Sequence, residues 1–128
     1  MSEPLWVSRN AVVILHSETV ARDGGLVGIR DENLLLSALA RPRNAWHYGV
    51  TEIEELAAAY ACGIAQNHPF LDGNKRAAFL ACLLFLRKNG FRLDAKPAEA
   101  TELFVNLAAG DLSEEELAAW IKSKLIAS

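Results

Sequence analysis

Two long apolar runs dominate the hydrophobic pattern of this chain, and neither leaves a polar face. The first covers residues 56–65 and the second covers residues 77–86. Their Ala and Leu content favours helix over strand, and a helix that is apolar on all sides is expected to be buried. The pattern therefore predicts two central core helices. The first opens at a capping box over residues 51–54 and runs to about Asn67, and the second runs from near Gly73 to Asn89-Gly90.

Capping residues and helix-breaking Gly or Pro residues predict four further helices, at about residues 9–22, 32–40, 97–109 and 113–125. Pro42 is expected to stop the second of these, whose core face is Leu34, Leu35, Leu36 and Leu39. No segment shows the alternation of a strand, and residues 91–93 are expected to be a short link. The fold class is predicted to be all-α: one domain over residues 1–128, with about six helices around the buried pair.

Composition narrows the function classes. The chain has 128 residues, is 52% hydrophobic and carries a net charge of −3, so it suits a globular domain and not a protein that coats nucleic acid through bulk charge. The first residues lack the basic start and apolar core of a signal peptide, and no run approaches the about 20 residues that cross a bilayer. A cytoplasmic protein with no direct nucleic-acid or membrane binding is expected. Cys62 and Cys82 are expected to be apolar fillers, although a disulfide between them stays open.

Polar residues outside the buried pair have modest predicted roles. His16 is expected to be a helix-surface or core-edge histidine, and Arg30-Asp31 a local salt bridge that fixes a turn. Residues 42–50 are expected to form an irregular loop or short hairpin. Its aromatic and cationic residues favour a binding surface or simple docking on the core about equally; they are Arg43, Trp46, His47 and Tyr48.

The candidate chemistry lies at the junction of the two buried helices, in residues 68–76. The first amide groups of a helix lack partners within it, and its dipole is positive at that end. Gly73 lets a ligand approach the backbone, and Asn74, Lys75 and Arg76 add donors, so the pattern predicts a phosphate cradle. Asp72 beside it can hold Mg²⁺. His68 is the residue type that takes a proton from a hydroxyl near neutral pH.

Each of these parts also has a plainer interpretation. His68 and Asp72 could form a structural hydrogen-bonded pair, or could ligate a transition metal, for which further Cys or His ligands nearby in the sequence are missing. Lys75 and Arg76 could be a solvated helix start. However, cations at a helix N-terminus oppose the dipole, and a bound anion would resolve that conflict.

At these residues the sequence resembles the Fic/Doc superfamily, and more closely its death-on-curing (Doc) toxin branch. The shared pattern is His-x-Phe-x-Asp-x-Asn-Lys-Arg, here His68 to Arg76. The stretches 24–31 and 36–42 also look like that branch, so the resemblance covers nearly the whole chain.

The resemblance implies a protein kinase toxin of a type II toxin–antitoxin system. It would use ATP and Mg²⁺ to phosphorylate a threonine or serine of a target protein, by resemblance translation elongation factor Tu, and would be neutralised by an antitoxin with a disordered C-terminal segment. By the same resemblance His68 is the base, Asp72 the Mg²⁺ ligand and residues 73–76 the phosphate cradle, with Arg76 also catalytic. The loop at 42–50 would be a flap that lays down the target segment as an added strand.

Two alternatives remain open from the sequence. AMP-transferring members of the superfamily carry Gly where this chain has Lys75 and a second Arg where it has Phe79, but Pro69 and Gly73 look like those members. The protein could therefore transfer AMP from ATP to a protein hydroxyl. It could also be a non-catalytic partner-binding relic, although the intact His68, Asp72 and Arg76 weigh against this.

Overall fold

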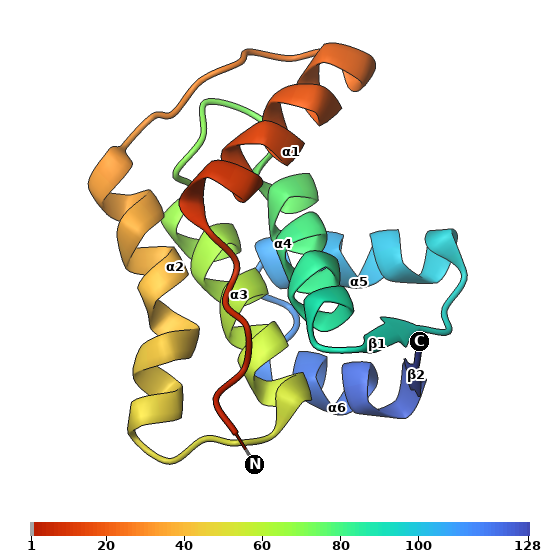
Figure 1. Ribbon diagram of the computed structural model, residues 1–128. Helices are drawn as coiled ribbons and strands as arrows, with labels where there is room; N and C mark the ends of the chain where they lie inside the picture. The colour runs from red at the N-terminus through yellow and green to blue at the C-terminus, as the bar shows by residue number, and fades with distance from the viewer. Residues whose placement is uncertain (1) are drawn as a thin grey trace.

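The computed structural model describes residues 2–128 and forms six helices and two short strands (Figure 1). They are α1 (Arg9–Asp23), α2 (Glu32–His47), α3 (Ile53–Asn67), α4 (Asn74–Lys88), β1 (Phe91–Leu93), α5 (Pro97–Ala108), α6 (Glu114–Lys124) and β2 (Leu125–Ala127). The predicted all-α class is confirmed. Helix α3 lies in the middle and packs against α2, α4 and α6. No helix in the described chain combines the length and the apolar character needed to cross a membrane.

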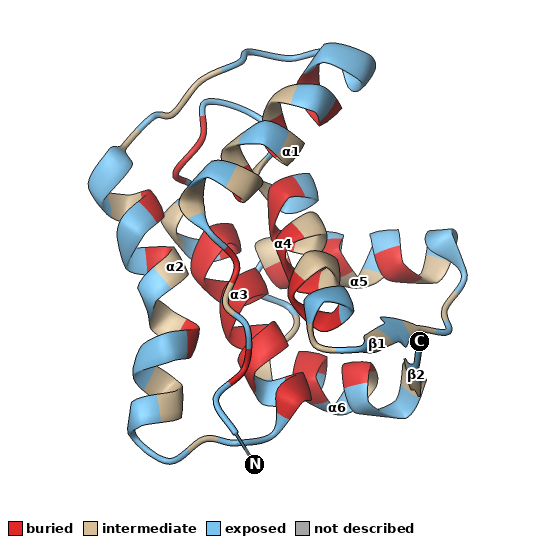
Figure 2. Cartoon of the chain, viewed as in Figure 1, coloured by how far each residue is buried: buried red, intermediate tan, exposed pale blue. Residues whose placement is uncertain are grey.

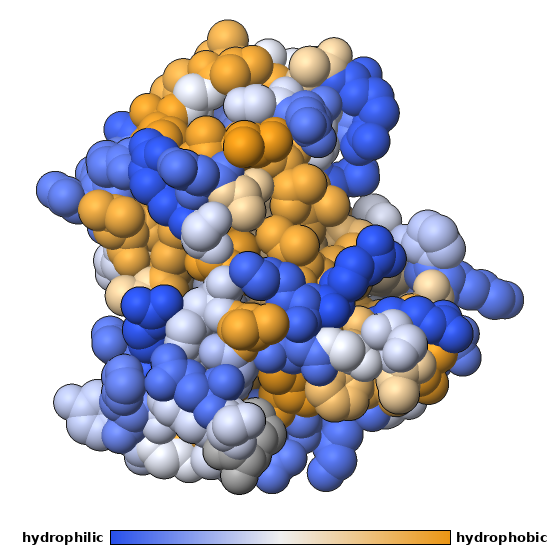
Figure 3. All heavy atoms as spheres, in the orientation of Figure 1, coloured by the Kyte–Doolittle hydropathy of each residue, from blue (hydrophilic) through white to orange (hydrophobic). Residues whose placement is uncertain are grey.

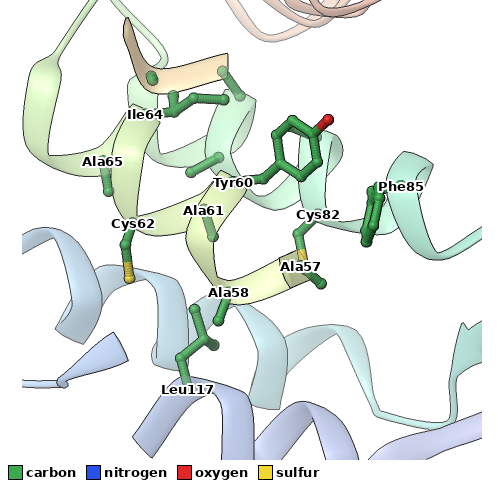
Figure 4. Packing of buried hydrophobic residues seen from close by; sticks show 14 of the residues in the cluster. Ala57, Ala58, Tyr60, Ala61, Cys62, Ile64, Ala65, Cys82, Phe85 and Leu117 are labelled. Carbon is green, nitrogen blue, oxygen red and sulfur yellow. The ribbon is translucent and has the colours of Figure 1, made fainter. Parts of the chain in front are cut away.

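Helix α3 is buried along almost its whole length, as its red colour in Figure 2 shows. Its small residues allow close approach of neighbouring backbones: a Cβ added at Gly63 would lie 3.1 Å from the Ala38 carbonyl oxygen of α2. Figure 4 shows the same packing on the α4 side, where the Tyr60 and Phe85 rings are 5.0 Å apart. The fold is thus organised around α3, whose C-terminal end carries the candidate site.

The two cysteines behave as the apolar fillers that the sequence predicted. Cys62 and Cys82 are free thiols, fully buried among the small side chains of the core (Figure 4). Burial raises the pKa of each to about 12. A thiol that stays protonated is a poor nucleophile, which agrees with a packing role for both cysteines.

Helix α4 differs from the prediction because one of its faces is not fully covered. Leu80, Leu83 and Leu84 are half-buried and line a groove of about 460 Å³ with residues of α1 and β1. Apolar atoms accordingly show between charged ones over α1 and α4 in Figure 3. The uniform apolar run did not reveal this face, because half-exposed and buried Leu residues read alike in a sequence.

Helix α2 corrects two predictions. It does not stop at Pro42 but continues to His47, so the predicted loop over residues 42–50 is wrong for most of its length. Proline inside a helix removes a hydrogen bond, but the Pro42 ring is fully buried, and this burial offsets the loss. Leu36 was also assigned to the core face and is instead exposed, whereas Leu35 and Ala38 are buried.

Smaller corrections concern the element ends. Residues 91–93 are not a link but a strand that pairs antiparallel with residues 125–127, with Arg92 opposite Ile126. Three-residue strands are too short to show alternation, which is why the sequence missed them. The predicted capping box at Thr51 is absent, since Glu52 occupies the N-cap of α3 without a side-chain hydrogen bond. The box predicted at Ser113 is present at the start of α6.

Candidate active site

The candidate site is the loop between α3 and α4, where His68 occupies an unusual backbone conformation. His68 caps the C-terminus of α3 with φ 48° and ψ 56°, the only non-glycine residue with positive φ in the described chain. This left-handed conformation costs roughly 1 kcal/mol for a residue with a Cβ and is common at helix C-termini. It turns the chain out of α3 and leaves the His68 side chain exposed.

Arg30 holds this turn from a distant part of the chain. Its Nε donates to the His68 carbonyl oxygen at 2.7 Å, and its Nη2 donates to the Asn67 carbonyl oxygen at 2.9 Å. The last carbonyl groups of a helix have no partner within it, so a guanidinium is well suited to this end. The predicted Arg30–Asp31 salt bridge is wrong: Asp31 instead caps α2 by accepting from the Leu34 amide at 3.0 Å.

The segment 24–31 runs beside the loop and fixes its course. Ile29 forms an antiparallel bridge with Phe70, and the Leu71 amide donates to the Gly28 carbonyl oxygen at 3.1 Å. The Asp72 carboxylate accepts from the Leu26 amide through Oδ2 at 2.8 Å. This bond orients the carboxylate while its other oxygen stays available.

His16 is a supporting residue whose role the sequence did not reveal. It is buried, its ring stacks on Phe70 with centroids 3.8 Å apart, and its Nε2 lies 2.6 Å from the Asp72 carbonyl oxygen. Because a carbonyl only accepts, Nε2 carries the hydrogen. The sequence could not predict this contact, because His16 and Asp72 are 56 residues apart and come together only in the folded chain. The expectation of a surface or core-edge histidine is corrected to a buried residue that contacts the site.

Asn74 closes the loop from the α4 side. Its Oδ1 accepts from the Phe70 amide at 2.9 Å, and its Nδ2 donates to the Phe70 carbonyl oxygen at 3.0 Å. The side chain therefore ties the middle of the loop, at Phe70, to the first residue of α4. Its predicted contact with phosphate stays a prediction, for which the second amide hydrogen remains.

The N-terminus of α4 has the features that the cradle prediction requires. Gly73 is the N-cap, with φ 75°, and provides no side-chain cap; the first turn carries no acidic residue. Lys75 and Arg76 occupy that turn instead and are exposed. Lys75 makes no ion pair within residues 2–128, and Arg76 has only a 3.9 Å contact with Asp23. An uncapped helix start bearing two cations attracts anions through both its amides and its side chains.

His68 and Asp72 line one cavity of about 500 Å³ together with Gly73, Asn74 and Lys75. The structure therefore brings the predicted base, metal ligand and cradle to the same place. In the described chain no hydrogen bond joins the His68 and Asp72 side chains, so the structural-pair interpretation has no support. Asp72 fits Mg²⁺, a hard cation that binds proteins through one or two carboxylates and completes its shell with water and substrate phosphates.

The residues predicted as a flap lie elsewhere. Arg43, Trp46 and His47 are on the last turns of α2, and Tyr48 caps it. Trp46 packs against Trp6, with ring centroids 6.5 Å apart. They lie beside the start of α3, whereas His68 lies at its end (Figure 1), and the 15 residues of α3 separate the two ends by about 22 Å at 1.5 Å per residue. Residues 43–48 therefore do not border the His68 loop, whereas residues 24–31 do; a role of residues 43–48 in binding the target stays a prediction.

Comparisons with known proteins agree with this arrangement. A model of the Fic/DOC family matches residues 6–86. This range includes the loop and the residues that hold it through hydrogen bonds, called here the tethers: His16, Leu26, Arg30 and Asn74. The chain belongs to the Fic/Doc family. It is 34% identical over 113 residues to the "Protein kinase doc" of Escherichia phage P1, covering 88% of this chain and 89% of that protein. It is 40% identical over 101 residues to the "Toxin Doc" of Mycolicibacterium smegmatis, covering 75% of this chain and 77% of that one. Both relatives are Doc proteins, so the predicted Doc branch of the Fic/Doc family is confirmed.

Proposed function

We propose that this protein is a Doc-type toxin that transfers the γ-phosphate of ATP to a serine or threonine hydroxyl of a target protein. The observation that carries the proposal is the uncapped start of α4, with Lys75 and Arg76 in its first turn and His68 and Asp72 beside it on one cavity. The name of the phage P1 relative, a protein kinase, supports the same reaction class.

The chain's own residues supply positioning and proton transfer. The γ-phosphate would bind the free amides of the α4 first turn with Lys75 and Arg76, which offset the charge of the transition state. His68 would accept the proton of the target hydroxyl as its oxygen attacks the γ-phosphorus and the bond to the β–γ bridging oxygen breaks. ADP leaves, and the proton remains on His68. When bound at Asp72, Mg²⁺ would neutralise charge on the phosphate oxygens.

The target would lie against segment 24–31, which takes the place of the flap that the sequence assigned to residues 42–50. Leu26 and Val27 are 63% and 58% exposed there, next to the backbone that bridges to the loop. An extended target segment added at this edge would bring its hydroxyl to His68. By the resemblance to Doc toxins the target is translation elongation factor Tu, and an antitoxin with a disordered C-terminal segment neutralises the protein.

AMP transfer is a second candidate, favoured by Gly73 and Pro69. Against it, the position of the second Arg is occupied by Phe79, whose ring packs on Phe104 with centroids 4.9 Å apart. That aromatic pair offers no charge to hold further phosphates.

ATP labelled at either the α- or the γ-phosphate tests the proposal directly. Purified protein and elongation factor Tu should yield a target labelled from the γ-phosphate only, and His68→Ala should lower the rate by about 10²–10⁴-fold, as expected for loss of a general base. Label from the α-phosphate would establish AMP transfer instead. Equal growth inhibition by the native protein and His68→Ala would refute catalysis altogether. Mass spectrometry after a pulse of expression would identify the target and the added mass.

A further inference from the structure

The cavity that His68 and Asp72 line, called here the His68 cavity, has an apolar side that the proposed reaction does not use. Its ionisable groups come from the loop and from the start of α4. Four apolar residues lie on the other side: Leu71 of the loop, and Val105, Ala108 and Ala109 at the end of α5. A threonine or serine side chain is small, so the residue that carries the target hydroxyl covers little of this apolar side.

Two of these residues are exposed to solvent although they are apolar. Leu71 is 47% exposed and Val105 is 45% exposed, and Leu26 and Val27, on the segment beside the loop, are exposed as well. Single exposed apolar side chains are ordinary features of a protein surface. A group of them around one site is instead typical of an interaction surface.

Leu71 joins the His68 cavity to the edge proposed for the target backbone. Its amide donates to the Gly28 carbonyl oxygen at 3.1 Å. Its side chain lies so close to Gly28 that a Cβ added there would be 3.3 Å from the Leu71 Cδ1 atom. Leu71 also follows His68 closely in the same loop. A target segment that lies along residues 24–31 and places its hydroxyl at His68 therefore passes Leu71.

The neighbours of the hydroxyl residue are the target groups that can reach the apolar side. An extended segment rises about 3.3 Å per residue, so two residues span about 7 Å. An apolar side chain within this distance would leave water on contact with Leu71 and Val105, whereas a polar one would lose hydrogen bonds to water without gaining a partner.

We infer that the protein selects a target with an apolar side chain within two residues of the hydroxyl, and that this side chain packs on Leu71 and Val105. The inference rests on the proposed kinase function and adds the class of target that the protein accepts.

A set of peptides and γ-labelled ATP test this selection. Each peptide carries one threonine, and the two positions on either side of it hold either glutamine alone or one leucine among glutamines. At saturating ATP, native protein should use the best leucine peptide with a kcat/KM about tenfold higher than the all-glutamine peptide, as expected if one apolar side chain is largely buried. This ratio does not depend on the folded fraction or on ATP binding, because both peptides are measured with the same protein.

Removal of the apolar side should abolish the preference. Leu71→Ser and Val105→Ser should each lower the ratio several-fold, and the double variant should bring it near one. Leu36→Ser is the matched control, since Leu36 is also 47% exposed but lies on α2 and does not line the His68 cavity. It should keep the native ratio.

The inference is overturned if native protein shows no preference for the leucine peptides, if the double variant keeps the native ratio, or if Leu36→Ser lowers the ratio equally. It is also overturned if native protein, but not His68→Ala, labels proteins of a cell lysate while no peptide is labelled. A side chain next to the hydroxyl would then not be the feature that selects the target. Absence of γ-label from both the peptides and the lysate proteins would instead refute the proposed function.

Discussion

The interior of α3 and the loop that follows it are held in place by different forces. Helix α3 is fixed by close apolar packing: from Leu56 to Ala65 every residue is buried, and every side chain is at most 3% exposed. The loop from His68 to Gly73 is mostly exposed apart from Pro69 and Phe70. It is held by hydrogen bonds that His16, Leu26, Arg30 and Asn74 donate to it.

This difference separates stability from chemistry. A single added methyl group in a close-packed core lowers stability. The same packing does not determine the geometry of the loop that follows the helix. The tethers contribute about 1 kcal/mol each, as ordinary hydrogen bonds do, but they set the positions of His68 and Asp72. Changes in α3 should therefore alter unfolding more than catalysis, and changes in the tethers should do the reverse.

The largest expected effect comes from a substitution at His68 that should lower the catalytic rate and raise the stability at the same time. His68→Gly removes the proposed base, so the rate should fall by about 10²–10⁴-fold. The same change relieves the left-handed backbone conformation and should raise the free energy of unfolding by about 1 kcal/mol. Chemical denaturation and the γ-phosphate transfer assay measure the two effects.

His68→Ala is the matched control for this exchange. It loses the imidazole equally but keeps a Cβ at φ 48°, so its stability should stay at or below that of the native protein. If His68→Gly and His68→Ala are equally stable, the backbone at position 68 stores no strain.

A substitution at Gly63 tests how tightly α2 and α3 are packed and whether that packing affects stability more than catalysis. A Cβ there would lie 3.1 Å from the Ala38 carbonyl oxygen and 3.2 Å from its Cα, both backbone atoms that cannot move away cheaply. Gly63→Val should therefore lower the free energy of unfolding by about 3 kcal/mol, at the upper end of overpacking costs. The folded fraction should keep native activity at a temperature well below its melting transition.

Ala119→Val, at an exposed position of α6, controls for the helix propensity of valine and should cost about 0.5 kcal/mol. A similar cost at both positions would show that α2 and α3 separate easily, and that the interior is less tightly packed than the comparison holds.

The two regions also differ in how far the sequence predicted them. The interior followed from the apolar runs and from cap signals, because burial and helix ends depend on residues close in sequence. The motif residues were predicted for the same reason, since His68 to Arg76 form one continuous segment. Pro42 shows the limit of local signals: the stop that it predicts was overridden by burial of its ring in the core.

The tethers could not be predicted, because each links segments far apart in the chain. His16 lies 56 residues before Asp72, and Arg30 lies 38 residues before His68. Neither position has a local pattern that distinguishes it from a surface histidine or a turn arginine. The position of residues 42–50 was predicted wrongly for a related reason, since aromatic residues near a motif in sequence were taken to be near it in space. Trp46 instead packs against Trp6, away from the loop.

Substitutions at His16 test whether the hydrogen bonds that hold the loop matter more for catalysis than for stability. His16→Phe keeps a ring to stack on Phe70 but cannot donate to the Asp72 carbonyl oxygen. The free energy of unfolding should fall by about 1 kcal/mol. The turnover rate should fall about tenfold, because Asp72 and Gly73 shift relative to the phosphates. His16→Gln, which can still donate a hydrogen bond, should recover part of the rate.

Ser17→Ala changes the next residue of the same helix and should leave both quantities near native. A loss of stability without a change in turnover would make His16 a core residue only, and would remove it from the set of tethers.

The smallest expected effect lies at Asp23, the last residue of α1, which lines a cavity between α1, α4 and α5. A hydrogen bond from Arg22, with a further contribution from Arg76, holds the pKa of its carboxyl below the usual value. The carboxylate is therefore charged at all pH values above about 4. It lies 3.9 Å from the Arg76 guanidinium, so it would repel phosphates bound at the first turn of α4. Asp23→Asn should tighten Mg-ATP about twofold at low salt, an effect of the size expected for one exposed charge.

The effect of Asp23→Asn on ATP affinity should depend on pH, because it requires the native Asp23 carboxylate to be charged. Because the folded pKa is depressed, any stability that Asp23 contributes is present above its unfolded pKa and is lost as the pH falls through the folded value. The twofold difference in ATP affinity should accordingly be constant from pH 6 to 8 and vanish as native Asp23 becomes protonated in acid. Asp94→Asn, at an exposed position beyond β1, should show no such difference. If both variants tighten ATP equally, the effect is one of net charge and Asp23 is not a neighbour of the bound phosphates.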